Sequence, residues 1–162
     1  LLRLSRGGTD ASVIREFDAK TKSFVKDGFV IPQAKSEYAW YDEDHLLVGT
    51  NFGEGTLTES GYPALLKLWK RGTPLSEAKL IFQGDKTDVR VGTTVYRGPE
   101  GKVMVVSKYQ SFFSSKKFLL DDDLNLLEIK IPEDARLSRV LGDQIALSLE
   151  GSSRWLCGEF LP

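Results

Sequence analysis

The chain has one cysteine, one histidine and one methionine among its 162 residues. A single cysteine excludes an internal disulfide, and with a single histidine there is no second Cys or His ligand at the spacing of a structural metal site. No apolar run approaches the ~20 residues that a helix needs to cross a bilayer. The sequence therefore gives no basis for a disulfide scaffold, a zinc site or a membrane span, and both cytoplasm and periplasm stay open as locations.

Charge of neither sign dominates. Lys and Arg total 22, Asp and Glu total 23, and the net charge is -1, so there is no bulk electrostatic case for binding nucleic acid or an anionic membrane. The apolar content of 41% is typical of a soluble globular protein, and the length is enough for one domain with a sizeable core. We therefore expect a globular protein with neither nucleic acid nor membrane among its partners.

Helical periodicity is nearly absent. Only "TPLSEA" at 73–78 has helix-start signals, and it allows about one turn. The rest reads as short β runs separated by Gly, Asp, Asn and Pro. The expected strands lie at 36–42, 45–51, 65–71 and 78–83, then at 89–97, 102–109, 116–121 and 126–131, and finally at 136–141, 144–150 and 154–160. An earlier unit is expected to end with strands at 1–5, 12–18 and 23–25.

These strands repeat in units of four. The second strands align at Val48, Val105 and Leu147, with spacings of 57 and 42 residues, and the longer spacing contains a loop at 48–63. Without that loop the period falls to the ~40–50 residues of a four-stranded propeller blade. Tight turns such as "YDEDHL" and "DDDLN" favour antiparallel hairpins. We predict an all-β fold of consecutive four-stranded antiparallel blades of a β-propeller, although alternation alone does not separate a propeller from a sandwich.

The units divide the chain into four parts. Residues 1–32 are expected to end one blade, 33–87 to form a blade with a long inserted loop, 88–133 to form the next blade, and 134–162 to start a further one. Strand-like runs stand at both ends, so we expect both ends to be cuts through a larger protein. A cut propeller exposes the apolar faces of its terminal blades, and we therefore expect the isolated chain to self-associate.

Three long stretches resemble one known family. "LSRGGTDASVIREFD" at 4–18, "VGTNFGEGTLTESGYP" at 48–63 and "LWKRGTPLSEA" at 68–78 resemble, in order and spacing, the seven-bladed propeller of bacterial prolyl oligopeptidase-like serine peptidases. The resemblance implies that the chain covers about three to four of the seven blades. It also implies a partner, the C-terminal α/β-hydrolase domain of the parent chain, which carries the catalytic residues.

The resemblance implies a non-catalytic role for this chain. A propeller of this family sits over the hydrolase domain, admits short peptides and keeps folded proteins out. The chain would therefore gate a hydrolase domain that it does not itself contain. The alternative is a propeller that acts only as a protein-interaction scaffold, with no hydrolase attached. A G-x-S-x-G motif followed by Asp and His in the parent gene would separate the two.

The motifs for chemistry within the chain are weak. "GEG" at 53–55 begins like G-x-G-x-x-G, but Thr58 occupies the third glycine position and no helix is expected to follow, so we predict an interstrand loop and not a phosphate site. "DDDLN" at 121–125 has the first spacings of an EF-hand without its glycine and glutamate, and we predict a turn. We interpret His45 as a turn residue and Cys157 as buried core. No G-x-S-x-G is present, and we expect no catalytic residue, cofactor or metal in this chain.

Five residues are candidates for the lining of a substrate chamber. Asp10 lies in "GGTD", which the resemblance places between two strands, where a carboxylate could attract the cationic end of a substrate; the alternative is an Asx-type turn residue. Lys108, Tyr109, Phe112 and Phe113 lie in "SKYQSFF" at the end of a strand. Aromatic faces there could pack against proline rings, or they could fill gaps between blades.

Overall fold

The computed structural model describes residues 1–98, 101–141, 144–149 and 152–159. Strands dominate this part of the chain, and the only helix among the described residues is a single 3-10 turn, η1 (Leu75–Glu77). This turn is the short helical segment expected within 73–78. Within the described ranges, no helix has the length and apolar character needed to cross a bilayer.

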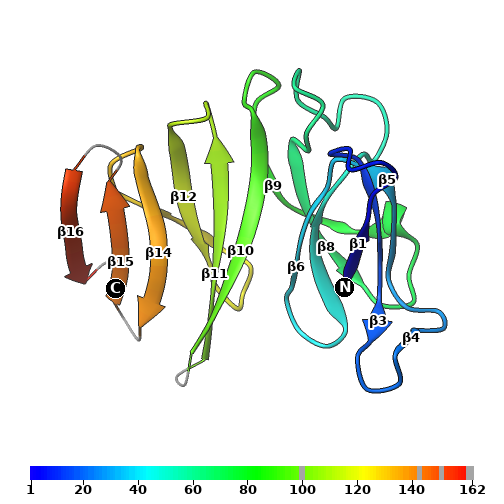
Figure 1. The fold of residues 1–162 in the computed structure, drawn as a ribbon. Coiled ribbons are helices and arrows are strands. Elements are labelled where there is room, and N and C mark those ends of the chain that lie inside the picture. Colours follow the sequence, from blue (N-terminus) through cyan, green and yellow to red (C-terminus); the bar gives the residue numbers. More distant parts are fainter. Residues whose placement is uncertain (99–100, 142–143, 150–151, 160–162) are drawn as a thin grey trace.

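Two four-stranded antiparallel sheets occupy the middle of the chain, each in sequence order (Figure 1). The first consists of β6 (Glu37–Trp40), β7 (His45–Gly49), β8 (Leu65–Lys70) and β9 (Lys79–Gln83). The second consists of β10 (Arg90–Gly98), β11 (Gly101–Tyr109), β12 (Ser115–Leu120) and β13 (Leu126–Ile129). A further sheet has β14 (Ala135–Leu141), β15 (Gln144–Leu149) and β16 (Ser152–Glu159). These strands differ from the predicted ranges only by a residue or two at their ends.

The sheet that precedes them differs from the prediction. It consists of β1 (Leu2–Leu4), β2 (Ser12–Arg15) and β5 (Val30–Ala34), in that order, while β3 (Phe17–Asp18) and β4 (Ser23–Phe24) form a separate small hairpin. The strand expected at 23–25 is present as β4, but its expected place as the third strand of this sheet was wrong, because β4 pairs with β3 and β5 is the strand that pairs with β2. The strand expected at 12–18 is divided into β2 and β3. β5 also crosses the expected boundary between residues 32 and 33; the division of the chain into four parts otherwise stays a prediction.

Two residues explain why β5 does not read as a strand. Pro32 has no backbone N–H to donate, which restricts it to an edge position, and β5 is the edge of its sheet. Just before β5 the chain passes close to the end of β2 at Gly28, where an added Cβ would lie 2.9 Å from the Cβ of Val25 and 3.0 Å from the Cβ of Glu16. Only glycine fits at this close approach. In the sequence, however, a glycine at this position is typical of a break between strands, so it argues against a strand nearby.

Alternate residues on each strand enter the cores on opposite sides of its sheet. On β7, Leu46 points into the core shared with the β1–β2–β5 sheet, and Leu47 points into the core shared with the β10–β13 sheet. On β11, Val106 joins this second core, whereas Val105 joins a third core with Leu147 of β15. Because consecutive sheets share one core after another, the β6–β9 and β10–β13 sheets are each covered on both faces by their neighbours.

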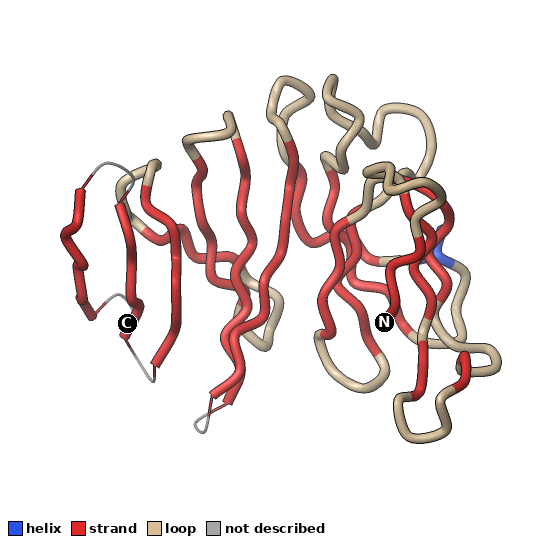
Figure 2. Tube along the Cα trace, viewed as in Figure 1, coloured by secondary structure: helices blue, strands red, loops and turns tan. Residues whose placement is uncertain are grey.

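The sheets stand side by side around a common line, with their first strands innermost. β10 lies against β6 of the preceding sheet and β14 of the following sheet (Figure 2). Four-stranded sheets packed in this way are propeller blades, and the predicted all-β propeller is confirmed. The β1–β2, β7–β8 and β11–β12 connections lie together at the upper end of the strands in Figure 2, which we call the loop end.

Candidate functional site

A cleft of about 570 Å³ lies at the loop end, between the β10–β13 and β14–β16 sheets. Strands β10, β11, β12 and β14 supply its walls, and Tyr62 reaches it from the β7–β8 loop. The lining combines serine and tyrosine hydroxyls and aromatic rings with charged side chains of both signs. The charged residues are Arg90, Lys117, Glu133, Asp134 and Arg136.

Three of the five predicted chamber residues line this cleft: Tyr109, Phe112 and Phe113. Phe112 is 82% and Phe113 is 73% exposed. Ser111 fixes the turn that presents them, because its Oγ accepts hydrogen bonds from the backbone N–H groups of Phe113 at 3.1 Å and Ser114 at 3.0 Å. The two rings therefore do not fill a gap between blades among the described residues, and they form the open edge of the cleft.

Lys108 lies on the other face of the same sheet. Adjacent residues of a strand point to opposite sides, so Lys108 faces away from the cleft that Tyr109 lines. Its ammonium group donates to Asp85 and lies 3.5 Å from Asp88. The hydrogen bond to Asp85 raises the pKa of Lys108, and the negative charge of Asp88 adds to this rise. The structure thus does not place Lys108 with the aromatic residues.

Asp10 lies at the loop end but does not line the cleft itself. Its Oδ2 accepts a hydrogen bond of 3.0 Å from the hydroxyl of Tyr62 and lies 3.9 Å from Lys35 Nζ. The bond to Asp10 raises the pKa of Tyr62. Asp10 therefore contacts the cleft only through Tyr62, which is a lining residue.

Sequence reasoning missed Lys117, whose side chain enters the cleft from β12. The residue is only 6% exposed, and its Nζ donates to Ser115 Oγ at 2.6 Å. Burial lowers the pKa of Lys117, and the positive charge of Arg136 lowers it further. One signal was available: in "KK" at 116–117 the two lysines must face opposite sides of a strand, so one of them has to point between blades.

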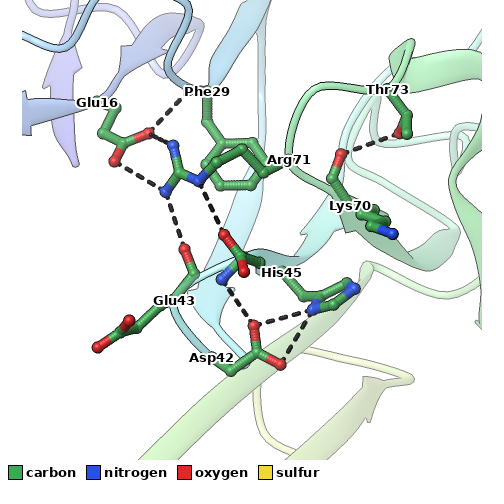
Figure 3. Close-up of polar contacts among 9 residues, drawn as sticks. Glu16, Phe29, Asp42, Glu43, His45, Lys70, Arg71 and Thr73 are labelled. Carbon is green, nitrogen blue, oxygen red and sulfur yellow. Dashed lines mark hydrogen bonds and ion pairs between the residues drawn. The ribbon is translucent and has the colours of Figure 1, made fainter.

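A network of charged groups lies at the other end of the strands (Figure 3). Arg71, just after β8, donates to Glu16 at 2.8 and 3.0 Å and to the backbone oxygen of Glu43 at 2.9 Å. His45 Nδ1 lies 2.9 Å from Asp42 Oδ1, within the β6–β7 turn. The hydrogen bonds from Arg71 lower the pKa of Glu16. This network ties sheets and turns together. His45 was predicted as a turn residue, but it is the first residue of β7, and its ring contacts Asp42 in the turn before that strand.

The two motifs rejected for ligand binding are connections between strands. Residues 50–64 join β7 to β8, so the predicted interstrand loop is confirmed. Asp121 accepts hydrogen bonds of 2.7 and 3.0 Å from the backbone and side-chain nitrogens of Asn125, which closes the predicted turn between β12 and β13. Within the described ranges, no group of three or more His, Cys, Asp or Glu side chains is placed to hold a metal ion. Cys157 belongs to β16, and its side chain lies outside the described part.

Residues 1–126 match the sequence model of a known family, "Prolyl oligopeptidase, N-terminal beta-propeller domain". The chain belongs to this family. The resemblance carried by the stretches at 4–18, 48–63 and 68–78 is thereby confirmed. Family membership accounts for the propeller blades but leaves the roles of the cleft residues as predictions.

Relatives and a solved structure agree with this assignment. The chain is 42% identical over 118 residues to the uncharacterized peptidase y4nA of Sinorhizobium fredii, covering 72% of this chain and 16% of the relative. It is 28% identical over 150 residues to the uncharacterized peptidase RP174 of Rickettsia prowazekii, covering 85% of this chain and 21% of the relative. The structure of a post-proline cleaving enzyme from Rickettsia typhi superimposes with a TM-score of 0.82 and 26% identity over 90% of this chain and 23% of that enzyme. The chain thus spans less than a quarter of the length of each of these proteins.

Proposed function

We propose that this chain is part of the propeller of a longer serine peptidase and controls the access of short peptides to a C-terminal α/β-hydrolase domain. The observation that carries the proposal is the structural likeness to the post-proline cleaving enzyme, with a TM-score of 0.82. Only 23% of that enzyme is matched, so most of its chain has no counterpart among these 162 residues. In a longer parent protein, a part that corresponds to the unmatched remainder of that enzyme could contain the hydrolase domain.

The chemistry of the chain supports a gating role over a catalytic one. It contains no G-x-S-x-G sequence, so a serine nucleophile of that type has to come from elsewhere. Consecutive sheets share continuous cores, which restricts passage between blades to small molecules. The exposed rings of Phe112 and Phe113 at the loop end offer flat apolar faces to a proline-containing peptide.

The relatives favour this function over a propeller that serves only as an interaction scaffold. Both curated relatives are described as peptidases, and the solved structure is that of a post-proline cleaving enzyme. No feature of the described residues favours the scaffold function specifically. We therefore keep cleavage after proline as the proposed activity of the parent protein.

The test uses the full-length parent protein and peptides of increasing length with one internal proline. We expect kcat/KM to fall by about tenfold or more between peptides of roughly ten residues and unfolded polypeptides of roughly a hundred, because entry is restricted by size. The isolated 162-residue chain, as the matched control, should not hydrolyse a chromogenic Gly-Pro substrate. Equal turnover of short and long substrates would disprove gating, and turnover by the isolated chain would disprove its non-catalytic role.

A further inference from the structure

Lys117 places a buried positive charge in the wall of the loop-end cleft. The side chain is 6% exposed, and the hydroxyl of Ser115 is the acceptor that its Nζ contacts, at 2.6 Å. No carboxylate among the described residues forms an ion pair with it. An ammonium group has three N–H donors, so the bond to Ser115 leaves donor capacity directed at the cleft.

A buried charge without a counter-charge is unfavourable for folding. Proteins generally pair such groups or neutralise them. Here the guanidinium of Arg136 lies close enough to disfavour the charged form of Lys117 further. A ligand that brings a negative charge into the cleft would therefore supply the counter-charge that Lys117 lacks.

The rest of the cleft restricts the kind of anion. Tyr109, Phe112 and Phe113 form an aromatic wall, which suits an apolar side chain attached to the anion. Glu133 and Asp134 lie at the same cleft and disfavour a multiply charged anion such as a phosphate, while they attract a positive amino group. A volume of about 570 Å³ is within the range of small-ligand pockets. A carboxylate, an apolar side chain and an ammonium group are together the features of a short peptide.

We propose that the loop-end cleft binds the C-terminal carboxylate of a short peptide, with Lys117 as the charged donor and the Tyr109–Phe112–Phe113 wall as the contact for an apolar side chain. This inference rests on the proposed function, since it names how a peptide admitted by the propeller is held. In this proposal the cleft binds only the C-terminal end of the peptide, and the residues that cleave the peptide lie outside this chain.

Calorimetric binding to the full-length protein tests the proposal without any need for catalysis. The ligands are the proline-free tripeptide Ala-Ala-Phe as the free acid and as the C-terminal amide. We expect the acid to bind at least about tenfold more tightly than the amide, because only the acid pairs with Lys117. Lys117→Met should remove this preference, and Lys117→Arg should retain part of it.

Lys116→Met is the matched control. Lys116 is the neighbouring lysine on the opposite face of β12, with its Nζ 3.7 Å from Glu128, and its loss should leave the preference for the acid intact. Melting curves establish that each variant is folded. An acid that binds no better than the amide, or a preference that survives in Lys117→Met, would overturn the proposal. Displacement of the peptide by inorganic phosphate at lower concentration than by acetate would overturn the assignment to a carboxylate. Because binding is read directly, a protein that binds the acid but cleaves no proline peptide would refute the proposed function alone.

Discussion

Arg71 and Glu16 join two neighbouring sheets through two parallel hydrogen bonds. Nη1 of Arg71 lies 2.8 Å from Oε2 of Glu16, and Nη2 lies 3.0 Å from Oε1 (Figure 3). Glu16 follows β2 and Arg71 follows β8, so the pair bridges two blades. The same carboxylate accepts the backbone N–H of Phe29 at 3.0 Å, and only 13% of the Glu16 side chain is exposed. The two-bond geometry and the low exposure make this pair stronger than an ordinary surface ion pair.

Replacing Arg71 should therefore destabilise the fold. We expect Arg71→Met to lower the free energy of unfolding by about 2–3 kcal/mol, since it leaves the carboxylate of Glu16 mostly buried without its main partner. Arg71→Lys should recover only part of the loss, because an ammonium group cannot reproduce the two-bond geometry. Urea unfolding of the parent protein measures the effect. Arg6→Met, at an exposed position, is the control and should change stability by less than about 0.5 kcal/mol; an equal effect of both changes would contradict the bridging role.

The same pair predicts an acid dependence of stability. The hydrogen bonds from Arg71 lower the pKa of Glu16 in the folded protein, so the folded state holds the proton less tightly than the unfolded state. The stabilisation is fully present above the usual glutamate pKa and is lost as pH falls through the lowered one. The gap in unfolding free energy between the wild type and Glu16→Gln should therefore narrow below the usual glutamate range. A gap that stays constant down to the lowest pH at which the protein folds would contradict this.

Lys117 predicts a pH dependence of the same sign, but in the alkaline range and from a charge that destabilises the fold. Burial lowers its pKa, so the unfolded state binds this proton more tightly, and the charge costs stability below the lowered pKa. As pH rises from the lowered value to the usual lysine value, this cost is relieved. Lys117→Met should therefore be more stable than the wild type at neutral pH, with a difference that shrinks in the alkaline range. Thermal unfolding across that range measures it; a variant less stable than the wild type at neutral pH would show that Lys117 has a favourable partner.

Removing the exposed rings should impair substrate use without affecting stability. Phe112 and Phe113 are 82% and 73% exposed, so the double change to serine should leave the unfolding midpoint nearly unchanged. If they hold short peptides, KM for a short proline-containing peptide should rise by roughly tenfold with a smaller change in kcat. Phe24→Ser, at a partly exposed ring on the separate β3–β4 hairpin, is the control and should leave both constants unchanged. An unchanged KM in the double variant would remove these rings from the substrate path.

The blades could be predicted from the sequence because three independent patterns agreed. Turn residues, strand length and the repeat of four all pointed to the same strands. β5 could not be predicted, since its proline and the preceding glycine are explained only by an edge position and a close contact between segments distant in sequence. A pattern of neighbouring residues in the sequence gives no information about a contact of this kind.

The candidate site was only partly predictable for a related reason. Tyr109 and Lys108 are neighbours on one strand and therefore cannot both face one cleft, which strand periodicity alone could have indicated. Strand periodicity indicates that one of Lys116 and Lys117 points between blades, but not which of the two, and lysine is ordinarily solvent-exposed, so the burial of Lys117 could be recognised only in the structure. The opening of the cleft depends on how two sheets meet, a property of tertiary packing.

The outer face of the β1–β2–β5 sheet predicts self-association of the isolated chain. Leu2 and Val30 both pair with Arg15, so they lie on one face of the sheet, and Leu4 lies on that face as well. These three residues are 39%, 47% and 44% exposed, respectively, whereas Ile14 on the opposite face is fully buried. In a propeller such a face is covered by the next blade. Exposed together, these side chains form an apolar patch of the kind that drives association.

We therefore expect the 162-residue chain, of 18.1 kDa, to form dimers or larger species at micromolar concentration. A two-fold dimer through this face is the simplest form, since one surface then covers its own copy. Leu4→Glu with Val30→Glu should shift the chain to monomer, because it places charges at the centre of the apolar face. Lys20→Glu, at an exposed position in the β3–β4 turn, should not. Size-exclusion chromatography with light scattering gives the masses, and a wild-type chain that is monomeric at these concentrations would show that this face needs no cover.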